Sequence, residues 1–295
     1  MVCSNRARTC ILPPKAMSAT FQIISDLHHE THTAYEFAFR QTAPNLALLG
    51  DIGQAADDGL FAFIETQLRR YWNVFFVPGN HEPVLGSWPA AKERFRSFAD
   101  RMEQLRSRST IGRFVFLDQT RHDVNKTLTV LGCTLFSRIT PAQSAAVASR
   151  FIDFRQIHGW TVEQHSDAHV SDVEWLNAQV SEISRAEPER RIIIFTHHSP
   201  TVDARAVDER HKDSPVGSGF ATDLRTEYCW TSPSVALWAF GHTHFSCDFT
   251  DDLGKRIVAN QKGYAAIPED AFDAKKVFHV GGGSASMQGG LLLSA

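Results

Sequence analysis

The sequence of 295 residues has few cysteines, and none of them lie at short spacing from one another. The five are Cys3, Cys10, Cys133, Cys229 and Cys247, an odd number with no C-x-x-C motif. This usage argues against a disulfide framework and against a structural zinc site. Cys133 lies in an apolar run, so we expect it to be a small core residue. A reducing compartment fits best, and we expect a cytoplasmic location.

The chain also lacks long apolar segments and an excess of charge of one sign. Pro13 and Pro14 interrupt the only apolar patch near the N-terminus, so no signal peptide is predicted. No run is long enough to span a membrane, and we expect no membrane partner. The net charge of −3 indicates no long-range attraction to nucleic acid, which we do not expect as a partner.

The sequence does contain a series of short apolar segments that alternate with helical patterns. The predicted strands are residues 21–25, 46–49, 74–77, 114–117, 128–136, 191–196, 235–240, a hairpin of 247–250 and 256–260, and 277–280. The predicted helices are 35–41, a helix from Asp58 with Phe61, Ile64, Leu68 and Trp72 on one face, a long helix from Pro89, and segments 142–149 and 171–184. Within 128–136 Gly132 is a candidate bulge. Strand and helix in alternation predict α/β layers and a largely parallel sheet.

The pattern contains no linker that would divide the chain. We therefore predict one domain over residues 20–280, with flexible tails at 1–19 and 281–295. The segment 137–169 breaks the alternation of strand and helix. A long irregular segment in a compact domain is often a lid or a binding loop, and we expect a lid here.

Polar side chains follow five of the predicted strands directly. They are Asp26 with His28, Asp51, Asn80 with His81, His197 with His198, and His242 with His244. Each group alone has an ordinary explanation, such as a turn or a surface histidine. Ligands of open α/β sheets collect at the carboxyl ends of strands, so five such groups together favour a metal site.

The number and type of these donors predict more than one ion. Two aspartates, one asparagine carbonyl and four histidines exceed the ligands of one tetrahedral zinc. They suit two ions about 3.5–4 Å apart that share a carboxylate. Mixed nitrogen and oxygen donors permit Zn, Mn or Fe.

These motifs, in their order along the chain, resemble the motif set of the calcineurin-like metallophosphoesterase superfamily. They are Asp26-x-His28, Gly50-Asp51, Gly79-Asn80-His81-Glu82, His197 and Gly241-His242-x-His244, within residues 21–260. The resemblance implies an α/β fold in which two mixed β-sheets form a sandwich flanked by helices, in α-β-β-α layers. It also implies a metal-dependent hydrolase of phosphoesters.

The resemblance further implies a role for each matching residue. One ion would be held by Asp26, His28 and His244, the other by Asn80, His197 and His242, with Asp51 bridging both. A metal-bridging hydroxide would attack phosphorus, and His81 would protonate the leaving group as general acid. Glu82 is expected to orient its neighbours. His197 comes directly after its strand, but His198 stays open as the ligand.

The chain departs from the protein Ser/Thr phosphatases of this superfamily after the second strand. Those enzymes have Gly-Asp-x-Val-Asp-Arg-Gly, whereas Gln54 and Ala55 stand here in place of the second aspartate and the arginine. The usual partner of the general acid and a guanidinium that would clamp a phosphomonoester dianion are therefore missing at that spacing. A diester carries one charge fewer, so we predict a small-molecule phosphodiesterase. The alternatives are a small-molecule phosphomonoesterase, a nuclease, which the charge disfavours, and a non-catalytic scaffold.

Other residues near the motifs are weaker candidates. His29, Arg155 and His198 are predicted substrate contacts, each with a structural explanation beside it. The segment 260–264 is expected to shape the floor of the pocket. We expect five other histidines, His122, His165, His169, His211 and His279, to lie on the surface or in the core.

Overall fold

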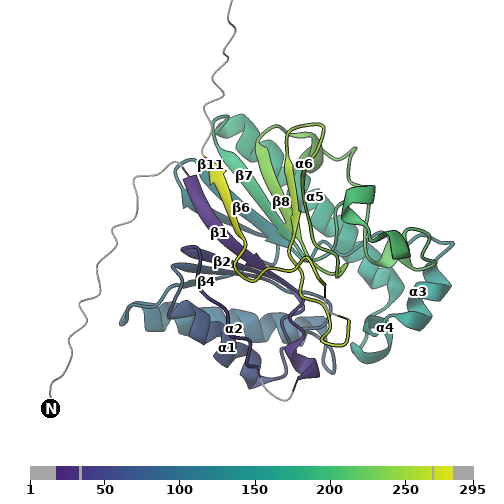
Figure 1. The fold of residues 1–295 in the computed structure, drawn as a ribbon, viewed down its shortest axis with the longest axis horizontal. Coiled ribbons are helices and arrows are strands. Elements are labelled where there is room, and N and C mark those ends of the chain that lie inside the picture. The colour runs from purple at the N-terminus through teal and green to yellow at the C-terminus, as the bar shows by residue number, and fades with distance from the viewer. Residues whose placement is uncertain (1–17, 33–34, 268, 282–295) are drawn as a thin grey trace, which may run out of the picture.

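Two β-sheets pack face to face, and helices cover their outer faces (Figure 1). The computed structural model describes residues 18–32, 35–267 and 269–281. The first sheet has the order β11-β1-β2-β3-β4. Its strands are β1 (Ser18–Ile24), β2 (Asn45–Leu49), β3 (Asn73–Val77), β4 (Arg113–Phe116) and β11 (Val277–Gly281). Strands β1 to β4 are parallel, and β11 is antiparallel at the edge.

The second sheet has the order β5-β6-β7-β8-β10-β9. Its strands are β5 (Thr120–Asn125), β6 (Leu128–Cys133), β7 (Arg191–Thr196), β8 (Val235–Phe240), β9 (Cys247–Thr250) and β10 (Arg256–Ala259). The four central strands are parallel, and β5 and β9 are antiparallel at the edges. The predicted sandwich of two mixed sheets is therefore confirmed.

The helices form the outer layers. On the first sheet lie α1 (Asp58–Leu68) and α2 (Trp88–Arg106), and on the second lie α5 (Val162–Ala186) and α6 (Tyr228–Thr231). Two short helices, α3 (Ser144–Arg150) and α4 (Asp153–Gln156), lie at one end of the sandwich (Figure 1). Single 3₁₀ turns are η1 (His29–Thr31), η2 (Ala204–Ala206), η3 (Glu209–His211) and η4 (Gly217–Gly219). No helix among the described residues is long and apolar enough to cross a membrane.

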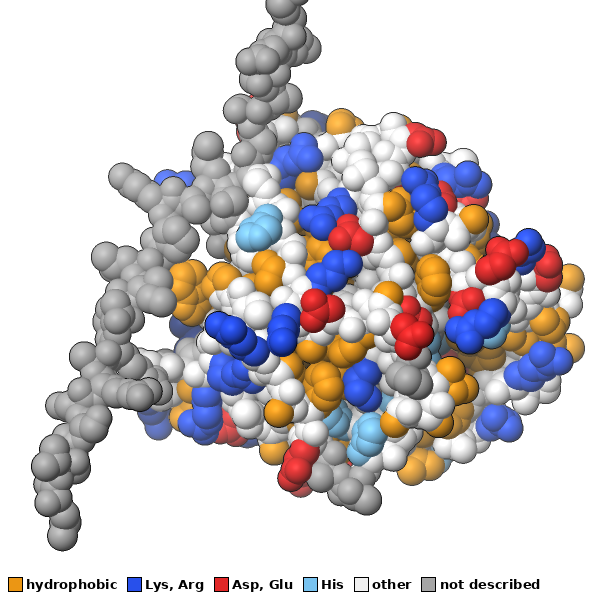
Figure 2. Space-filling view, in the orientation of Figure 1, with side chains coloured by type: hydrophobic (Ala, Val, Ile, Leu, Met, Phe, Trp, Pro, Cys, Tyr) orange, Lys and Arg blue, Asp and Glu red, His pale blue; other side chains and the backbone are white. Residues whose placement is uncertain are grey.

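Three apolar layers hold the sandwich together. One lies between α1, α2 and the first sheet, one between the sheets, and one between the second sheet and α5. Phe21 packs between Phe75 and Phe195 in the middle layer, with ring centroids 5.8 and 5.6 Å apart. Complete burial of such a ring stabilises a fold by about 1.5–3 kcal/mol. On the surface seen in Figure 2, basic and acidic side chains are interspersed.

Because the central strands are parallel, parts of the chain that are distant in sequence meet at one edge of the sheets. Because β1, β2 and β3 run in the same direction, the residues that follow them meet beyond the same end of the sheet. The amide of Asp26 donates to the carbonyl of Gly50 at 3.0 Å, and that of Gly241 donates to His197 at 2.9 Å. These bonds fix the loops after the strands relative to one another.

Two helix predictions are wrong. Residues 35–41 form no helix. Phe37 is half-buried and Phe39 is buried, whereas Glu36, Ala38 and Arg40 are exposed, and this period of two is typical of extended chain. Helix α1 ends at Leu68, before Trp72, whose side chain is 41% exposed.

Several boundaries also differ from prediction. Helix α5 begins at Val162, well before residue 171, because Thr161 and Gln164 form a capping box. Strand β5 was not predicted, and its register shift with β6 lies between Asp123 and Asn125, away from Gly132. The predicted tails lie outside the described residues apart from their inner ends, which belong to β1 and β11.

Candidate metal centre

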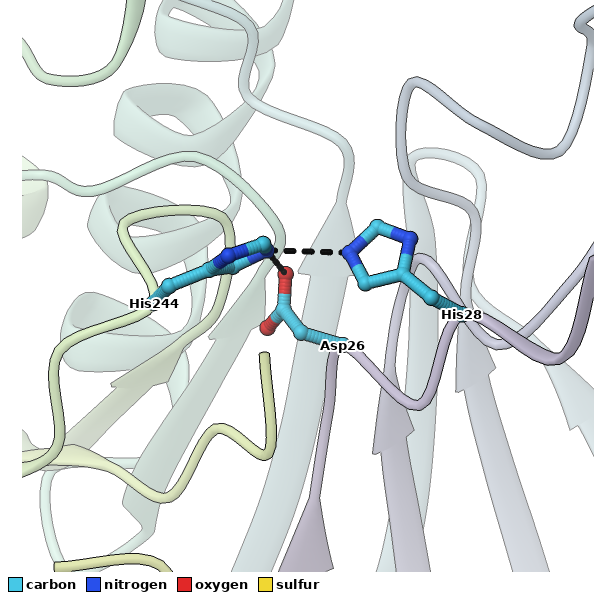
Figure 3. Close-up of side chains that lie close together, drawn as sticks. All are labelled: Asp26, His28 and His244. Atoms are coloured by element: carbon cyan, nitrogen blue, oxygen red, sulfur yellow. Dashed lines mark hydrogen bonds and ion pairs between the residues drawn. The ribbon is translucent and has the colours of Figure 1, made fainter. Parts of the chain in front are cut away.

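Asp26, His28 and His244 meet where β1 and β8 end (Figure 3). Nε2 of His244 lies 3.4 Å from Oδ1 of Asp26 and 2.9 Å from Nε2 of His28. Nδ1 of His28 lies 2.8 Å from Oε1 of Glu30, so it carries the proton and Nε2 presents a lone pair. Two imidazole nitrogens and a carboxylate oxygen directed at one point suit a bound cation.

A second group of donors lies where β2, β3 and β7 end. Nδ1 of His197 donates to the carbonyl of Leu49 at 2.8 Å, which leaves Nε2 free. That atom lies 3.4 Å from Oδ2 of Asp51 and 3.0 Å from Oδ1 of Asn80. Nε2 of His242 is buried and has no hydrogen-bond partner among the residues that the structure describes. A buried imidazole nitrogen without a partner costs stability unless a ligand such as a metal ion takes it.

Asp51 lies between the two groups. Its Oδ2 atom is 3.4 Å from Nε2 of His197 in one group and 3.9 Å from Nε2 of His28 in the other. Its Oδ1 atom accepts the backbone N–H of His81 at 2.8 Å. Burial raises the pKa of this carboxyl, but the neighbouring histidines outweigh that effect and hold it well below its usual value. An ionised carboxylate in this position fits the sharing of two cations.

The backbone of the donor loops is in an unusual conformation. Nine described residues other than glycine have a positive φ, and five of them are Asp26, His28, Asp51, His242 and His244. Such left-handed residues each cost of order 1–3 kcal/mol and collect at functional sites. The turns direct these side chains beyond the strand ends.

Glu82 joins the loop after β2 to the loop after β3. Its carboxylate accepts backbone N–H groups from Gly79 at 2.6 Å, Asp51 at 3.1 Å and Ile52 at 2.8 Å. Burial and the nearby Asp51 charge raise the pKa of Glu82 to about 8. A side chain at position 79 would collide with the Asp51 carboxylate, so only glycine fits there. The predicted orienting contacts of Glu82 are therefore present.

His81 lies beside both groups and is held at both ring nitrogens. Nδ1 lies 2.9 Å from Oε1 of Glu30, and Nε2 lies 3.2 Å from the hydroxyl of Tyr264. Burial lowers the pKa of His81, but the charges of Asp51 and Glu30 outweigh burial and raise it to about 10. Nε2 lies 4.0 Å from Oδ2 of Asp51, at the edge of the donor set. The imidazole can therefore exchange a proton beside the metal centre.

Asp153 orients the amide of Asn80 from outside the motif set. Nδ2 of Asn80 donates to Oδ1 of Asp153 at 2.9 Å, which turns the carbonyl oxygen of Asn80 towards His197. Asp153 is buried and comes from α4, within the segment predicted to be a lid.

A cavity of about 1010 Å³ adjoins the metal centre. Its wall includes Asp51, Asn80, His81, Tyr264 and both histidines of the His242 motif. The rest of the wall comes from residues 138–153 and 202–223. The expectation that 260–264 shapes the pocket holds for Tyr264, and residues from the first half of the predicted lid segment contribute to the wall.

The three predicted substrate contacts lie away from the described lining of this cavity. His29 packs against Tyr35 and Phe63, with centroids 5.0 and 4.8 Å apart. The guanidinium of Arg155 donates to the carbonyls of residues 151 and 150 at 3.4 and 3.3 Å. His198 is buried behind His242, with ring centroids 4.2 Å apart. Their positions give no support to direct substrate contact. His198 lies behind His242, away from the donors around Asp51.

The other histidines divide between core and surface. His165 and His169 are buried and bond to the backbone around residues 135–137. His279 and His211 are exposed, and His211 lies on the cavity wall.

The sequence did not predict the contacts that three residues make with His28, His81 or Asn80: Glu30, Asp153 and Tyr264. Glu30 has a signal, because Asp26, His28 and Glu30 alternate along the chain. Asp153 has none, because its partner Asn80 is 73 positions away.

The sandwich and the His/Asp groups at its edge are those of an α/β protein with a candidate metal site. The model of the calcineurin-like phosphoesterases matches residues 19–246, so the chain belongs to this family of metal-dependent phosphoester hydrolases. It is 26% identical over 229 residues to the uncharacterized protein L509 of Acanthamoeba polyphaga mimivirus, covering 75% of this chain and 78% of that protein.

Two solved structures are similar to this chain. One is phosphopantetheinyl hydrolase PptH from Mycobacterium tuberculosis, with a TM-score of 0.59 and 16% identity over 85% of this chain and 92% of that one. The other is a dimetal phosphatase from Danio rerio, with a TM-score of 0.47 and 15% identity over 82% and 86% of the two chains. The likeness to PptH shows the same fold.

Proposed function

We propose that this chain is a small-molecule phosphodiesterase that uses two divalent or mixed-valence transition-metal ions. The observation that carries the proposal is the pair of donor groups on either side of Asp51, next to a large cavity. Asp26, His28 and His244 would hold one ion, and Asn80, His197 and His242 would hold the other. Asp51 contributes to both.

Bound ions would supply Lewis acidity at the phosphoryl oxygens and lower the pKa of water. The residues of the chain do the rest. Glu30 and the Leu49 carbonyl fix the tautomers of His28 and His197, so that Nε2 of each is available. His81, which lines the cavity, gives a proton to the departing oxygen as general acid.

The preference for a diester rests on the charges around the centre. Ala55 is buried where the family's protein phosphatases place an arginine, and Arg155 is directed to backbone carbonyls. No Lys or Arg among the described residues bonds to a donor of the metal centre. A monoester dianion would lack a guanidinium clamp there, whereas a diester monoanion needs less cationic help.

The test combines metal content with turnover. The full chain, purified and reconstituted, should hold close to two transition-metal ions. It should hydrolyse an aryl phosphodiester with a higher kcat/KM than the corresponding monoester. Absence of bound metal after reconstitution would refute the metal centre. A preference for the monoester would leave the hydrolase intact and make the chain a phosphomonoesterase.

A further inference from the structure

Two arginines on the cavity wall, Arg138 and Arg150, have no hydrogen-bond or ion-pair partner for their guanidinium groups within the described ranges. The remaining charges of the wall beyond the metal centre are paired. Their pairs are Asp208 with Arg210 at 2.5 Å, Glu209 with Lys212 at 2.6 Å, and Asp223 with Arg225 at 2.7 Å. The cavity therefore has two uncompensated positive charges.

The backbone around both arginines is held by neighbouring elements of the wall. The N–H of Arg138 donates to Oγ1 of Thr222 at 2.8 Å, and the N–H of Thr140 donates to Oγ of Ser218 at 3.2 Å. Arg150 is the last residue of α3, directly before Phe151, which is buried. The backbone of both residues is therefore held in place, while their exposed guanidinium groups can reach an anion in the cavity.

Aromatic rings beside the metal centre line the same cavity. The ring of Phe220 lies 4.9 Å from that of Phe151 and 4.9 Å from that of His242. A cavity of about 1010 Å³ is at the upper end of the volumes of small-molecule sites and exceeds what one phosphate group fills. The site therefore has room for an organic group beside the phosphoester.

We infer that the cavity takes an organic phosphoester with a second anionic group, which Arg138 and Arg150 bind. The organic part packs on Phe151 and Phe220, and the second group is a phosphate or a carboxylate. A guanidinium binds either one through two parallel charge-assisted hydrogen bonds. This inference rests on the proposed function, because it names the substrate class of the same cavity.

Equilibrium binding tests the inference without turnover. The full chain, with metals bound, is titrated in a calorimeter with thymidine monophosphate and with thymidine bisphosphate, which has a phosphate on each sugar hydroxyl. The second phosphate should tighten binding about tenfold or more at low salt. The gain should shrink as ionic strength rises, because the arginine side chains are exposed.

Variants test whether the two arginines cause the gain in affinity from the second phosphate. Arg138→Ala and Arg150→Ala should each reduce the gain from the second phosphate, and the double variant should abolish it. Arg108→Ala is the matched control: Arg108 is also exposed, has no side-chain partner among the residues described, and lies outside the cavity lining. It should leave the gain unchanged.

Turnover gives a second measurement. The p-nitrophenyl ester of thymidine phosphate, with and without the extra phosphate on the other hydroxyl, loses the same leaving group in both forms. The extra phosphate should lower KM about tenfold with little change in kcat, and the arginine variants should reverse this.

Two results would overturn the inference: an equal affinity of the wild type for the mono- and bisphosphate, or an equal loss on both ligands in the arginine variants. The second result would place the arginines on the phosphate that is attacked. If neither ester is hydrolysed, the proposed function fails, while the binding comparison still decides the inference.

Discussion

Oε1 of Glu30 lies 2.9 Å from Nδ1 of His81, the proposed general acid. The family's protein phosphatases place an aspartate two residues after Ile52, where this chain has Gln54. Glu30 reaches the same imidazole from the first strand-end loop, and the same oxygen lies 2.8 Å from Nδ1 of His28. One carboxylate therefore orients both a metal donor and the proposed general acid.

Replacement of Glu30 should weaken both metal binding and proton donation by His81. In Glu30→Ala, Nδ1 of His28 and Nδ1 of His81 both lose their acceptor, so the two rings are free to turn. Loss of such an outer partner typically lowers metal affinity or activity by about 10–100-fold. Competitive titration with a chelator measures the affinity, and initial rates on an aryl diester measure kcat.

Glu30→Gln is the informative conservative variant, because its amide oxygen can take the place of Oε1, the atom that both imidazoles contact, but carries no negative charge. It should retain more metal affinity than Glu30→Ala. Glu36→Ala, an exposed glutamate nearby, is the control and should behave as wild type. Wild-type affinity and rate in Glu30→Ala would remove Glu30 from any orienting role.

His81→Ala should retain both metals and lose turnover selectively. The loss should be about 10²–10⁴-fold for diesters with poorly activated alkoxide leaving groups, which need a proton on departure. It should be small for p-nitrophenolate, which leaves without one. Rates across a series of leaving groups give the dependence on leaving-group pKa, which should be steeper in the variant.

His158→Ala, an exposed histidine outside the centre, controls for loss of an imidazole and should keep the wild-type dependence. A uniform loss across all leaving groups in His81→Ala would point to a role in positioning rather than in proton donation.

The sequence predicted most donors because their positions follow from strand polarity. Asp26, Asp51, Asn80, His197 and His242 all follow parallel strands, and parallel strands deliver their ends to one edge of a sandwich. The apolar runs also identified both sheets, apart from β5, whose residues are polar and half-buried.

The remaining contacts depend on geometry that no local pattern contains. Glu30 meets His81 only because Asp26 and His28 adopt left-handed turns that fold the loop back. Asp153 reaches Asn80 across the sandwich end from a one-turn helix. Residues 35–41 were predicted to be a helix, but Tyr35, Phe37 and Phe39 alternate with exposed residues along an extended segment.

Removal of the Asp153 carboxylate should affect one metal position more than the other. Asp153→Ala frees the amide of Asn80 to rotate, which takes its carbonyl oxygen away from His197. Metal titration should then show one site weakened by about tenfold or more and the other close to wild type. Asp167→Ala, an exposed aspartate on α5, is the control. Equal weakening of both sites would show that Asp153 acts on the whole loop.

The buried His165 should make stability depend on pH. Its Nε2 accepts the N–H of Ser137 at 3.0 Å, and burial lowers its pKa to about 3, below the value of about 6.5 expected in the unfolded chain. The unfolded chain therefore binds a proton that the folded chain does not. The stabilisation from neutral His165 is fully present above pH 6.5 and is lost as the pH falls towards 3.

His165→Gln should remove this contribution, because an amide oxygen can accept the same N–H without titrating. Urea unfolding at a series of pH values below 6.5 should give a slope shallower than that of the wild type by up to about 1.4 kcal/mol per pH unit. His279→Gln removes an exposed histidine and should keep the wild-type slope. Identical slopes in His165→Gln and the wild type would mean that His165 takes up its proton in the folded chain, which its burial against Phe136 and Phe154 opposes.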